Sequence, residues 1–435
     1  MSAELVVLLG GRNVGRVTQS PRGELAFTYD TRWRDLHDAY PLSVSMLMTR
    51  GTHGDAAIRP WLEGLLPDND AVLKRWRMRY QVSERNLMGL LAHVGEDCAG
   101  AVQLITPEWM AGGFAAADPL VEWLSDAEIG ARLADLRTTG AGERYGDDPG
   151  AFSLAGAQPK TALLFQDGRW GVPSGRVPTT HILKPPSGPF DGLAENEHLC
   201  QRLASGVGLT AAYSEVRRFG EEAAIVVERY DRLRVGGQWL RIHQEDLAQA
   251  LGTSPRIKYE AEGGPGVGAI AGVLRRHSSS ADEDLSSFVG ALALNWAIGG
   301  TDGHAKNFSL LIAPGQVRLA PLYDVISVLP YPRLVPPRRA RLAMRVGREY
   351  ALWKIGRMHW ERLGEEIGIG SEAAVERVRS ILVQIPDAIS AAVAGARRDE
   401  IEHPILDTLQ TTVTAHAITC LRRLESSGNA DEASF

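Results

Sequence analysis

The first hundred residues begin and end with short apolar runs separated by turn-forming residues. The apolar runs at residues 5–9, 14–18 and 25–29 are separated by the sequences GGRN and SPRG. Runs of this length bounded by glycine, asparagine and proline predict strands. Strand character returns at residues 100–105.

Between residues 60 and 91 the apolar side chains follow helical spacing instead. The sequence LPDN at residues 66–69 resembles a helix cap, and Val72, Leu73 and Trp76 follow it. Residues 1–110 therefore read as a small α+β module.

The rest of the chain changes from strands to helices near residue 230. Residues 138–150, TTGAGERYGDDPG, form a glycine- and acid-rich connector. After Arg232 the pattern is mostly helical, broken by GGPG at residues 263–266. A β-containing half followed by a helical half predicts a bilobal protein with a nucleotide cleft at the junction. Strands are expected at residues 161–165, 169–172, 181–183 and 224–228, and the last helices at 371–398 and 407–424.

Composition narrows the class of protein. The 435 residues are 44% hydrophobic, and the net charge of −6 argues against nucleic-acid or membrane binding by the chain as a whole. The three cysteines, Cys98, Cys200 and Cys420, lie far apart, which argues against a disulfide framework or structural zinc. The N-terminus lacks the pattern of a signal peptide, and the longest apolar stretch, residues 288–300, is too short to span a bilayer. We expect a soluble, cytoplasmic protein with no membrane partner.

The strongest chemical signal is the loop GTDGHAKN at residues 300–307. Asp302 and Asn307 are five residues apart, the offset of the aspartate and asparagine in protein-kinase catalytic loops. The two apolar runs that follow, folded as a hairpin around APGQ, return Tyr323 and Asp324 to the side of Asn307. Asp324 is then placed as a second magnesium ligand, because magnesium prefers oxygen ligands. The simpler alternative is that Asp302 and Asn307 cap turns and Asp324 ends a strand.

Two further motifs suit phosphate binding. The sequence SLAGAQPKT at residues 153–161 combines small residues with a lysine before a strand, but it is not a Walker A motif. Lys184 ends the run THILK, as the strand lysine of kinases does, and Glu195 or Glu197 is its expected acidic partner. Only six of the 47 basic residues are lysine, and three of the six lie in these motifs and the GTDGHAKN loop. Alternatively, the first motif is an ordinary turn and Lys184 an exposed edge-strand lysine.

Together these segments resemble the HipA family of kinase toxins from bacterial type II toxin–antitoxin modules. The likeness covers most of residues 1–425 in order. The matching segments are FSLAGAQPKTALL, THILKPP, ENEHL, VVERYDR, HQEDLAQALG, YEAEGGPG, NWAIGGTDGHAKNFSLL, LAPLYDV, LAMRVGREY, EGLLPDND and GEDCAGAVQL.

The resemblance implies an α+β, bilobal, protein-kinase-like fold related to lipid kinases. It has an N-terminal β-rich subdomain and a mostly helical C-terminal lobe. The expected segments are an N-terminal α+β subdomain at 1–110, a helix and connector at 111–150, the nucleotide-binding part of the N-lobe at 151–230, a helical C-lobe with catalytic loop and metal site at 231–425, and a flexible tail at 426–435.

The resemblance also implies ATP and Mg²⁺ as cofactors. Asp302 matches the catalytic base, Asn307 and Asp324 the magnesium ligands, and Ser153 the autophosphorylated serine. Pro159 departs from the family, which is expected to carry an acidic residue there, and proline stiffens the loop. The ATP-binding positions are Ala155, Gly156, Ala157, Gln158, Pro159, Lys160, Lys184, Glu228, Arg229, Tyr230, His304, Ala305, Lys306, Asn307, Tyr323 and Asp324.

The implied partners are a small helix-turn-helix antitoxin and, through the antitoxin complex, operator DNA. The implied protein substrate is an aminoacyl-tRNA synthetase such as glutamyl-tRNA synthetase. Two alternatives stay open: a pseudokinase co-repressor that acts only through antitoxin and DNA, and a small-molecule phosphotransferase of the aminoglycoside-kinase type. The SLAGAQPKT loop and the N-terminal module argue against the second alternative. An arginine-rich segment at residues 333–348 is either a solvated loop or a basic face for nucleic acid or an acidic partner.

Overall fold

The computed structural model describes residues 4–83, 86–112, 114, 120–139, 152–156 and 158–426. The chain divides into two compact units, each assembled from separate stretches of sequence. Unit 1 comprises Met1–Ser187, Arg217–Arg256 and Ser309–Val317, and unit 2 comprises Gly188–Val216, Ile257–Phe308 and Arg318–Phe435.

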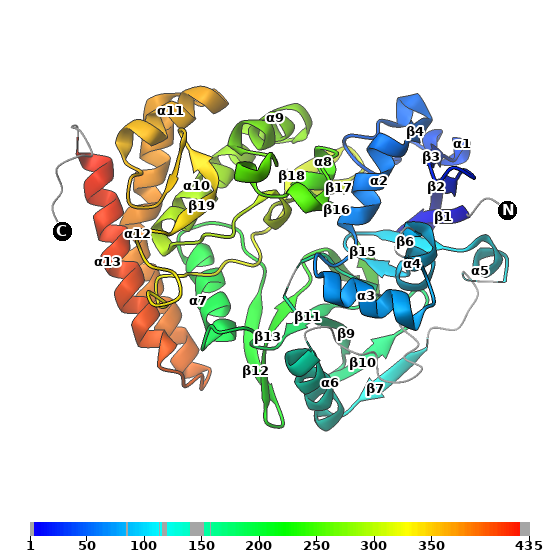
Figure 1. The fold of residues 1–435 in the computed structure, drawn as a ribbon, viewed down its shortest axis with the longest axis horizontal. Coiled ribbons are helices and arrows are strands. Elements are labelled where there is room, and N and C mark those ends of the chain that lie inside the picture. The colour runs from blue at the N-terminus through cyan, green and yellow to red at the C-terminus, as the bar shows by residue number, and fades with distance from the viewer. Residues whose placement is uncertain are drawn as a thin grey trace. The chain divides into compact units, whose positions relative to one another are not determined.

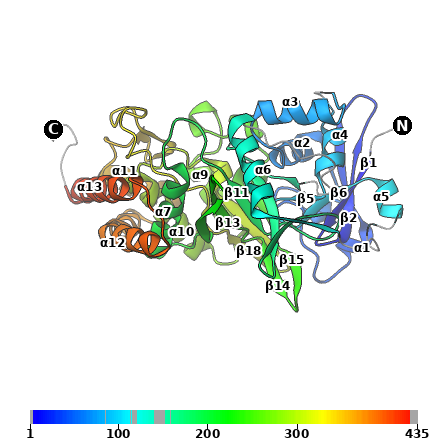
Figure 2. The same ribbon diagram turned by 90° about the horizontal axis from the view of Figure 1, so that it is seen from below.

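Unit 1 begins with a five-stranded antiparallel sheet in the order β4-β3-β2-β1-β6. Helices α2 and α4 pack on this sheet, and Figure 2 shows both beside its strands. Phe27, Trp61 and Leu104 are buried between the layers. The strands predicted near the N-terminus and at residues 100–105 are thus confirmed. Their bounds are β1 (Glu4–Leu9), β2 (Arg12–Gln19), β3 (Leu25–Tyr29), β4 (Thr52–Gly54) and β6 (Val102–Ile105).

The helical stretch predicted at residues 60–91 consists of three helices, α2 (Asp55–Gly64), α3 (Asp70–Arg79) and α4 (Leu87–Val94). The predicted cap is confirmed, because the Asn69 side chain accepts a hydrogen bond from the Ala71 N–H at 2.9 Å at the start of α3. Shorter helices in unit 1 are α1 (Thr31–Arg34), α5 (Pro107–Ala111) and α8 (Leu247–Ala250).

A second sheet has six strands in the order β12-β13-β11-β9-β10-β7, and all of them except β12 lie wholly in unit 1. Helix α6 (Asp126–Thr139) packs on it, and Leu133, Trp170 and Phe219 share one buried cluster. All four strands predicted between residues 161 and 228 are confirmed. The bounds are β7 (Val121–Leu124), β9 (Thr161–Gln166), β10 (Arg169–Pro173), β11 (His181–Lys184), β12 (Ser214–Phe219) and β13 (Glu222–Glu228).

Helices predominate after Arg232, as predicted, but strands that were not predicted come first. Three strands follow, β14 (Arg232–Val235), β15 (Gln238–Arg241) and β16 (His243–Asp246), and β16 pairs with β17 (Ser309–Ala313). Gly236 and Gly237 both have positive φ, 57° and 82°, which a two-residue hairpin turn requires. Leu233 and Leu240 face each other across the hairpin and are about half exposed. These strands therefore lack the buried apolar side chains by which a strand is usually predicted from sequence.

Unit 2 is mostly helical, with α10 packed against α9, α12 and α13. Figures 1 and 2 both show α12 alongside α13. The helices predicted at residues 371–398 and 407–424 are confirmed. The bounds are α7 (Leu193–Gly206), α9 (Val267–His277), α10 (Ala281–Ile298), α11 (Arg357–Ile367), α12 (Ser371–Arg398), α13 (Ile405–Glu425) and a hairpin of β19 (Arg341–Val346) and β20 (Glu349–Ala351).

Within the part of the chain that the structure describes, α12 alone is long and apolar enough to cross a membrane. Half of its most apolar stretch is buried, and α12 packs against α7, α10, α11 and α13. Core helices of soluble proteins have the same length and composition, so this feature is weak evidence for a membrane span.

Candidate active site

The loop GTDGHAKN begins where helix α10 ends. Gly299 closes the helix in the left-handed conformation, with φ of 65°, and the Gly300 N–H donates to the Asn295 carbonyl at 2.7 Å. A Cβ atom at Gly300 or Gly303 would collide with the Asn295 side chain. Asn295 therefore sets the shape of the loop from inside the helix, a role that the sequence did not reveal.

Within this loop, Asp302 and Asn307 are held close together. The Asn307 side-chain amide donates to the Asp302 carbonyl at 2.9 Å, so Oδ1 is the Asn307 atom that a cation would bind. The His304 N–H donates to the same carbonyl at 2.8 Å, and η4 (Ala305–Asn307) follows. The Asp302 side chain itself is 62% exposed, whereas His304, Ala305, Lys306 and Asn307 are buried.

The predicted hairpin after this loop is confirmed. It consists of β17 and β18 (Gln316–Leu319), with Gly315 at φ of 67° in the turn. After it, the Tyr323 hydroxyl donates to the Lys306 carbonyl at 2.7 Å, which brings Tyr323 and Asp324 back to the loop as expected. Asp324 has φ of 58°, a left-handed conformation that aspartate tolerates better than most residues.

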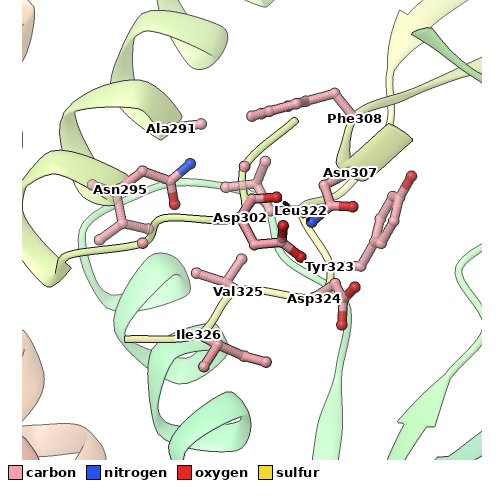
Figure 3. Close-up of a pocket in the computed structure, with 13 residues that line it drawn as sticks. Ala291, Asn295, Asp302, Asn307, Phe308, Leu322, Tyr323, Asp324, Val325 and Ile326 are labelled. Atoms are coloured by element: carbon pink, nitrogen blue, oxygen red, sulfur yellow. Dashed lines mark hydrogen bonds between the residues drawn. The ribbon is translucent and has the colours of Figure 1, made fainter. Parts of the chain in front are cut away.

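Asp302, Asn307, Tyr323 and Asp324 line one pocket in unit 2 (Figure 3). The close-up shows Asp302, Asn307 and Asp324 around the polar side of the pocket. Two carboxylates and one amide oxygen fit a hard cation such as Mg²⁺. Among the residues that the structure describes, no group of three or more His, Cys, Asp or Glu is placed to hold a metal. The apolar side is lined by Ala291, Leu294, Phe308, Leu322, Val325 and Ile326.

The SLAGAQPKT loop lies in unit 1, where it contacts the end of helix α2 and a short strand, β5. The Ser153 hydroxyl is fully buried and donates to the Leu65 carbonyl at 2.9 Å. The Lys160 ammonium donates to the Ala155 carbonyl at 2.6 Å, and Gly156 has φ of 111°. Two strands, β5 (Asp97–Cys98) and β8 (Phe152–Ser153), pair in parallel here. Gln158 and Pro159 are half-buried, and Ala157 lies outside the described residues.

Lys184 is buried at the end of β11, opposite Ile225 of β13. Its two expected partners, Glu195 and Glu197, lie on α7 in unit 2. At the other end of the same strand pair, Glu228 is exposed opposite His181. The Tyr230 hydroxyl donates to the Gln244 side chain.

Arg229 is one of the predicted ATP-binding residues. Its guanidinium is buried and bonds Asp231, Thr179 and the Cys98 carbonyl. Its N–H donates to the Thr180 carbonyl at 2.9 Å, and its carbonyl accepts from the Arg232 N–H at 3.1 Å. The side chain and the backbone of Arg229 therefore form hydrogen bonds in the interior of unit 1.

The buried charges around Arg229 form a network that the sequence did not reveal. Arg229, Arg232 and Arg241 all reach Asp97, whose side chain also accepts from Thr179. Burial alone would raise the pKa of Asp97, but the three arginines hold that pKa below its ordinary range. The motif ERYDR at the end of an apolar strand was the one local hint of buried ion pairs.

Comparison with known proteins identifies the family. The family model of the HipA-like C-terminal domain matches residues 152–390, and that of the HipA N-terminal domain matches residues 5–105. A Sinorhizobium fredii protein named as a candidate kinase, Y4mE, is 36% identical over 393 residues, which is 89% of this chain and 90% of that protein. The serine/threonine-protein kinase toxin HipA of Shewanella oneidensis is 28% identical over 426 residues, 95% of this chain and 93% of the toxin.

A solved structure confirms the predicted fold. The complex of Shewanella oneidensis HipA with HipB and operator DNA contains a chain that matches with a TM-score of 0.81 at 24% identity, over 96% of this chain and 97% of that one. This match supports the α+β, protein-kinase-like fold with a β-rich N-terminal part and a mostly helical C-terminal part. The chain belongs to the HipA family and is a protein kinase.

Proposed function

We propose that this chain is the toxin of a type II toxin–antitoxin module and transfers the γ-phosphoryl group of ATP to a serine or threonine of a protein. The observation that carries the proposal is the pocket in unit 2, where Asp302, Asn307 and Asp324 lie together. This set combines the proton acceptor and the cation ligands that phosphoryl transfer requires.

In this proposal Asp302 is the general base. Its exposed carboxylate accepts the proton of the acceptor hydroxyl while the hydroxyl oxygen forms its bond to the γ-phosphorus, and the bond to the β–γ bridging oxygen of ATP breaks. Asn307 and Asp324 hold Mg²⁺, which neutralises charge on the phosphates when it is bound.

The remaining predicted residues bind the nucleotide. We assign the phosphates to the loop from Ala155 to Lys160 and to Lys184, and adenine to the strand end from Glu228 to Tyr230. We also assign ATP contacts to the buried residues His304, Ala305 and Lys306 of the GTDGHAKN loop and to Tyr323, which follows the β17–β18 hairpin. The segment boundaries at residues 110, 150, 230 and 425 remain our proposal for the domain organisation.

The proposed partners follow from the relatives. The Shewanella HipA was solved with HipB and operator DNA, which supports an antitoxin partner and DNA contact through that complex. An aminoacyl-tRNA synthetase, with glutamyl-tRNA synthetase as the first candidate, is the proposed substrate, and the cytoplasm is the proposed location. The pseudokinase alternative is disfavoured, because Asp302, Asn307 and Asp324 are all present in one pocket.

Replacing Asp302, the proposed general base, tests this function. Asp302→Asn is expected to keep nucleotide binding but to lower phosphoryl transfer by about 10²-fold or more, the usual effect of losing a general base. Purified protein is incubated with γ-labelled ATP, Mg²⁺ and a bacterial lysate, and labelled proteins are identified by mass spectrometry.

The matched control is Asp387→Asn, the same change at an exposed position of α12 outside the pocket. It should transfer phosphate like the natural protein. Near-normal transfer by Asp302→Asn would refute the role of Asp302.

A further inference from the structure

A tyrosine outside the predicted site touches the proposed base directly. The Tyr259 hydroxyl donates a hydrogen bond to Oδ1 of Asp302 at 2.6 Å, and both residues belong to unit 2. A hydroxyl-to-carboxylate bond of this length is typical of charge-assisted hydrogen bonds. The bond holds one oxygen of a side chain that is otherwise largely exposed to solvent.

Backbone hydrogen bonds and a tight glycine turn fix the loop that carries Tyr259. The Tyr259 carbonyl accepts from the N–H groups of Glu262 and Gly264, at 3.0 and 2.9 Å. Gly263 has φ of 93°, and a Cβ atom at Gly264 would collide with the Ile257 carbonyl. The turn therefore depends on the glycines of YEAEGGPG.

The next residue, Glu260, anchors the same loop. Its carboxylate accepts from the Arg345 N–H at 2.7 Å and pairs with the Arg345 guanidinium at 2.9 Å. Tyr259 is thus fixed at the point where the loop meets the β19 strand of unit 2.

The ring of Tyr259 is also fixed on the side of the GTDGHAKN loop. It meets the ring of buried His304 edge to face, with centroids 5.0 Å apart and an interplanar angle of 79°. His304 Nε2 lies 3.9 Å from the same Oδ1 of Asp302. The tyrosine, the histidine and the aspartate therefore form one packed group.

We infer that Tyr259 is a positioning residue for the catalytic base. By holding Oδ1, its hydroxyl restricts rotation of an exposed carboxylate and leaves Oδ2 for the hydroxyl of the protein acceptor. This inference rests on the proposed role of Asp302.

The experiment is Tyr259→Phe, which keeps the ring and removes only the hydroxyl. The initial rate of transfer from γ-labelled ATP to lysate protein, at saturating ATP, should fall about tenfold, the effect of one hydrogen bond to a charged group. The KM for ATP should not change. The matched control is Tyr331→Phe, which removes a hydroxyl that donates to the Asp191 carbonyl at 2.8 Å in the same unit, away from the pocket lining.

Each possible result of this experiment supports or overturns the positioning role of Tyr259. A natural rate in Tyr259→Phe would overturn it, and so would a faster rate, which would mean that the hydroxyl obstructs the acceptor. An equal loss of rate in Tyr331→Phe would mean that both changes act through stability. Asp302→Asn separates the two proposals: if it remains active, the proposed base is wrong; if it is inactive while Tyr259→Phe is normal, only the role of Tyr259 fails.

Discussion

Asp324 combines a strained backbone with a proposed metal ligand. Its φ of 58° lies in the left-handed region, where a single non-glycine residue costs roughly 1–2 kcal/mol. Strain of this kind persists only where the surrounding structure enforces it, and it is concentrated at functional sites. The neighbouring Tyr323 helps to enforce it, because the Tyr323 hydroxyl donates to the Lys306 carbonyl and so holds this corner of the chain.

This conformation determines which substitution tests Asp324 cleanly. Asp324→Asn is expected to abolish magnesium-dependent ATP binding without adding backbone strain, because asparagine tolerates left-handed φ as well as aspartate does. Asp324→Ala should lose the same binding and also some stability. ATP affinity is measured in a magnesium titration, with the melting temperature recorded for both variants. Unchanged affinity in Asp324→Asn would contradict the assignment.

At the scale of elements, the SLAGAQPKT loop is held by the N-terminal part of unit 1. The β5–β8 pairing, the bond from Ser153 to Leu65, and the bond from the Asp68 N–H to the Gly156 carbonyl at 3.3 Å all fasten it. Since Ser153 is fully buried, a phosphate on its hydroxyl has no room in this arrangement. Phosphorylation of Ser153 therefore requires the SLAGAQPKT loop to move out of this position.

We predict that a charge on Ser153 inactivates the kinase. A phosphoserine adds about −1.5 to −2 charge, and its desolvation would favour a displaced loop. Ser153→Asp should bind ATP weakly and be non-toxic in cells, whereas Ser153→Ala loses only the hydrogen bond to Leu65. The measurement is ATP affinity of the separated phosphorylated and unmodified forms, verified by mass spectrometry. Equal affinity in the two forms would end this hypothesis.

At the scale of the whole molecule, the net charge of −6 hides a local excess of arginine in unit 2. The arginines predicted as a basic segment are all exposed. Arg345 is partly neutralised by Glu260, and Arg341 lies over the Tyr350 ring at 5.3 Å. The exposed set is Arg333, Arg338, Arg339, Arg341, Arg345 and Arg348.

If this basic segment binds operator DNA in the antitoxin complex, its charge should appear in the salt dependence of binding. Replacing Arg333, Arg339 and Arg348 with glutamine should reduce the slope of log affinity against log salt by about 0.9 for each DNA phosphate that an arginine no longer neutralises. The charge-matched control replaces the exposed Arg22, Arg256 and Arg276. An unchanged slope in the first variant would leave the segment as a solvated surface.

Local sequence patterns predicted many of the strands and helices and the residues of the pocket. The Asp302–Asn307 spacing and the hairpin behind it predicted the pocket, because its residues lie within a short stretch of sequence joined by one turn. The periods predicted strands β1, β2, β3, β9, β10, β11 and β13 and helices α12 and α13. They failed at β14 and β15, where Leu233 and Leu240 are largely exposed and two glycines set the turn.

Only the tertiary structure decided the contacts between distant residues. Arg229 reaches Asp97, 132 positions away, and Tyr259 reaches Asp302, 43 positions away. An arginine or a tyrosine has the same local pattern whether it faces solvent or a buried carboxylate. The difference lies in desolvation and in the partner that folding brings near, since a buried charge is stable only when it is paired. For this reason the sequence alone did not reveal the buried ion pairs of Arg229 and left Tyr259 without a role.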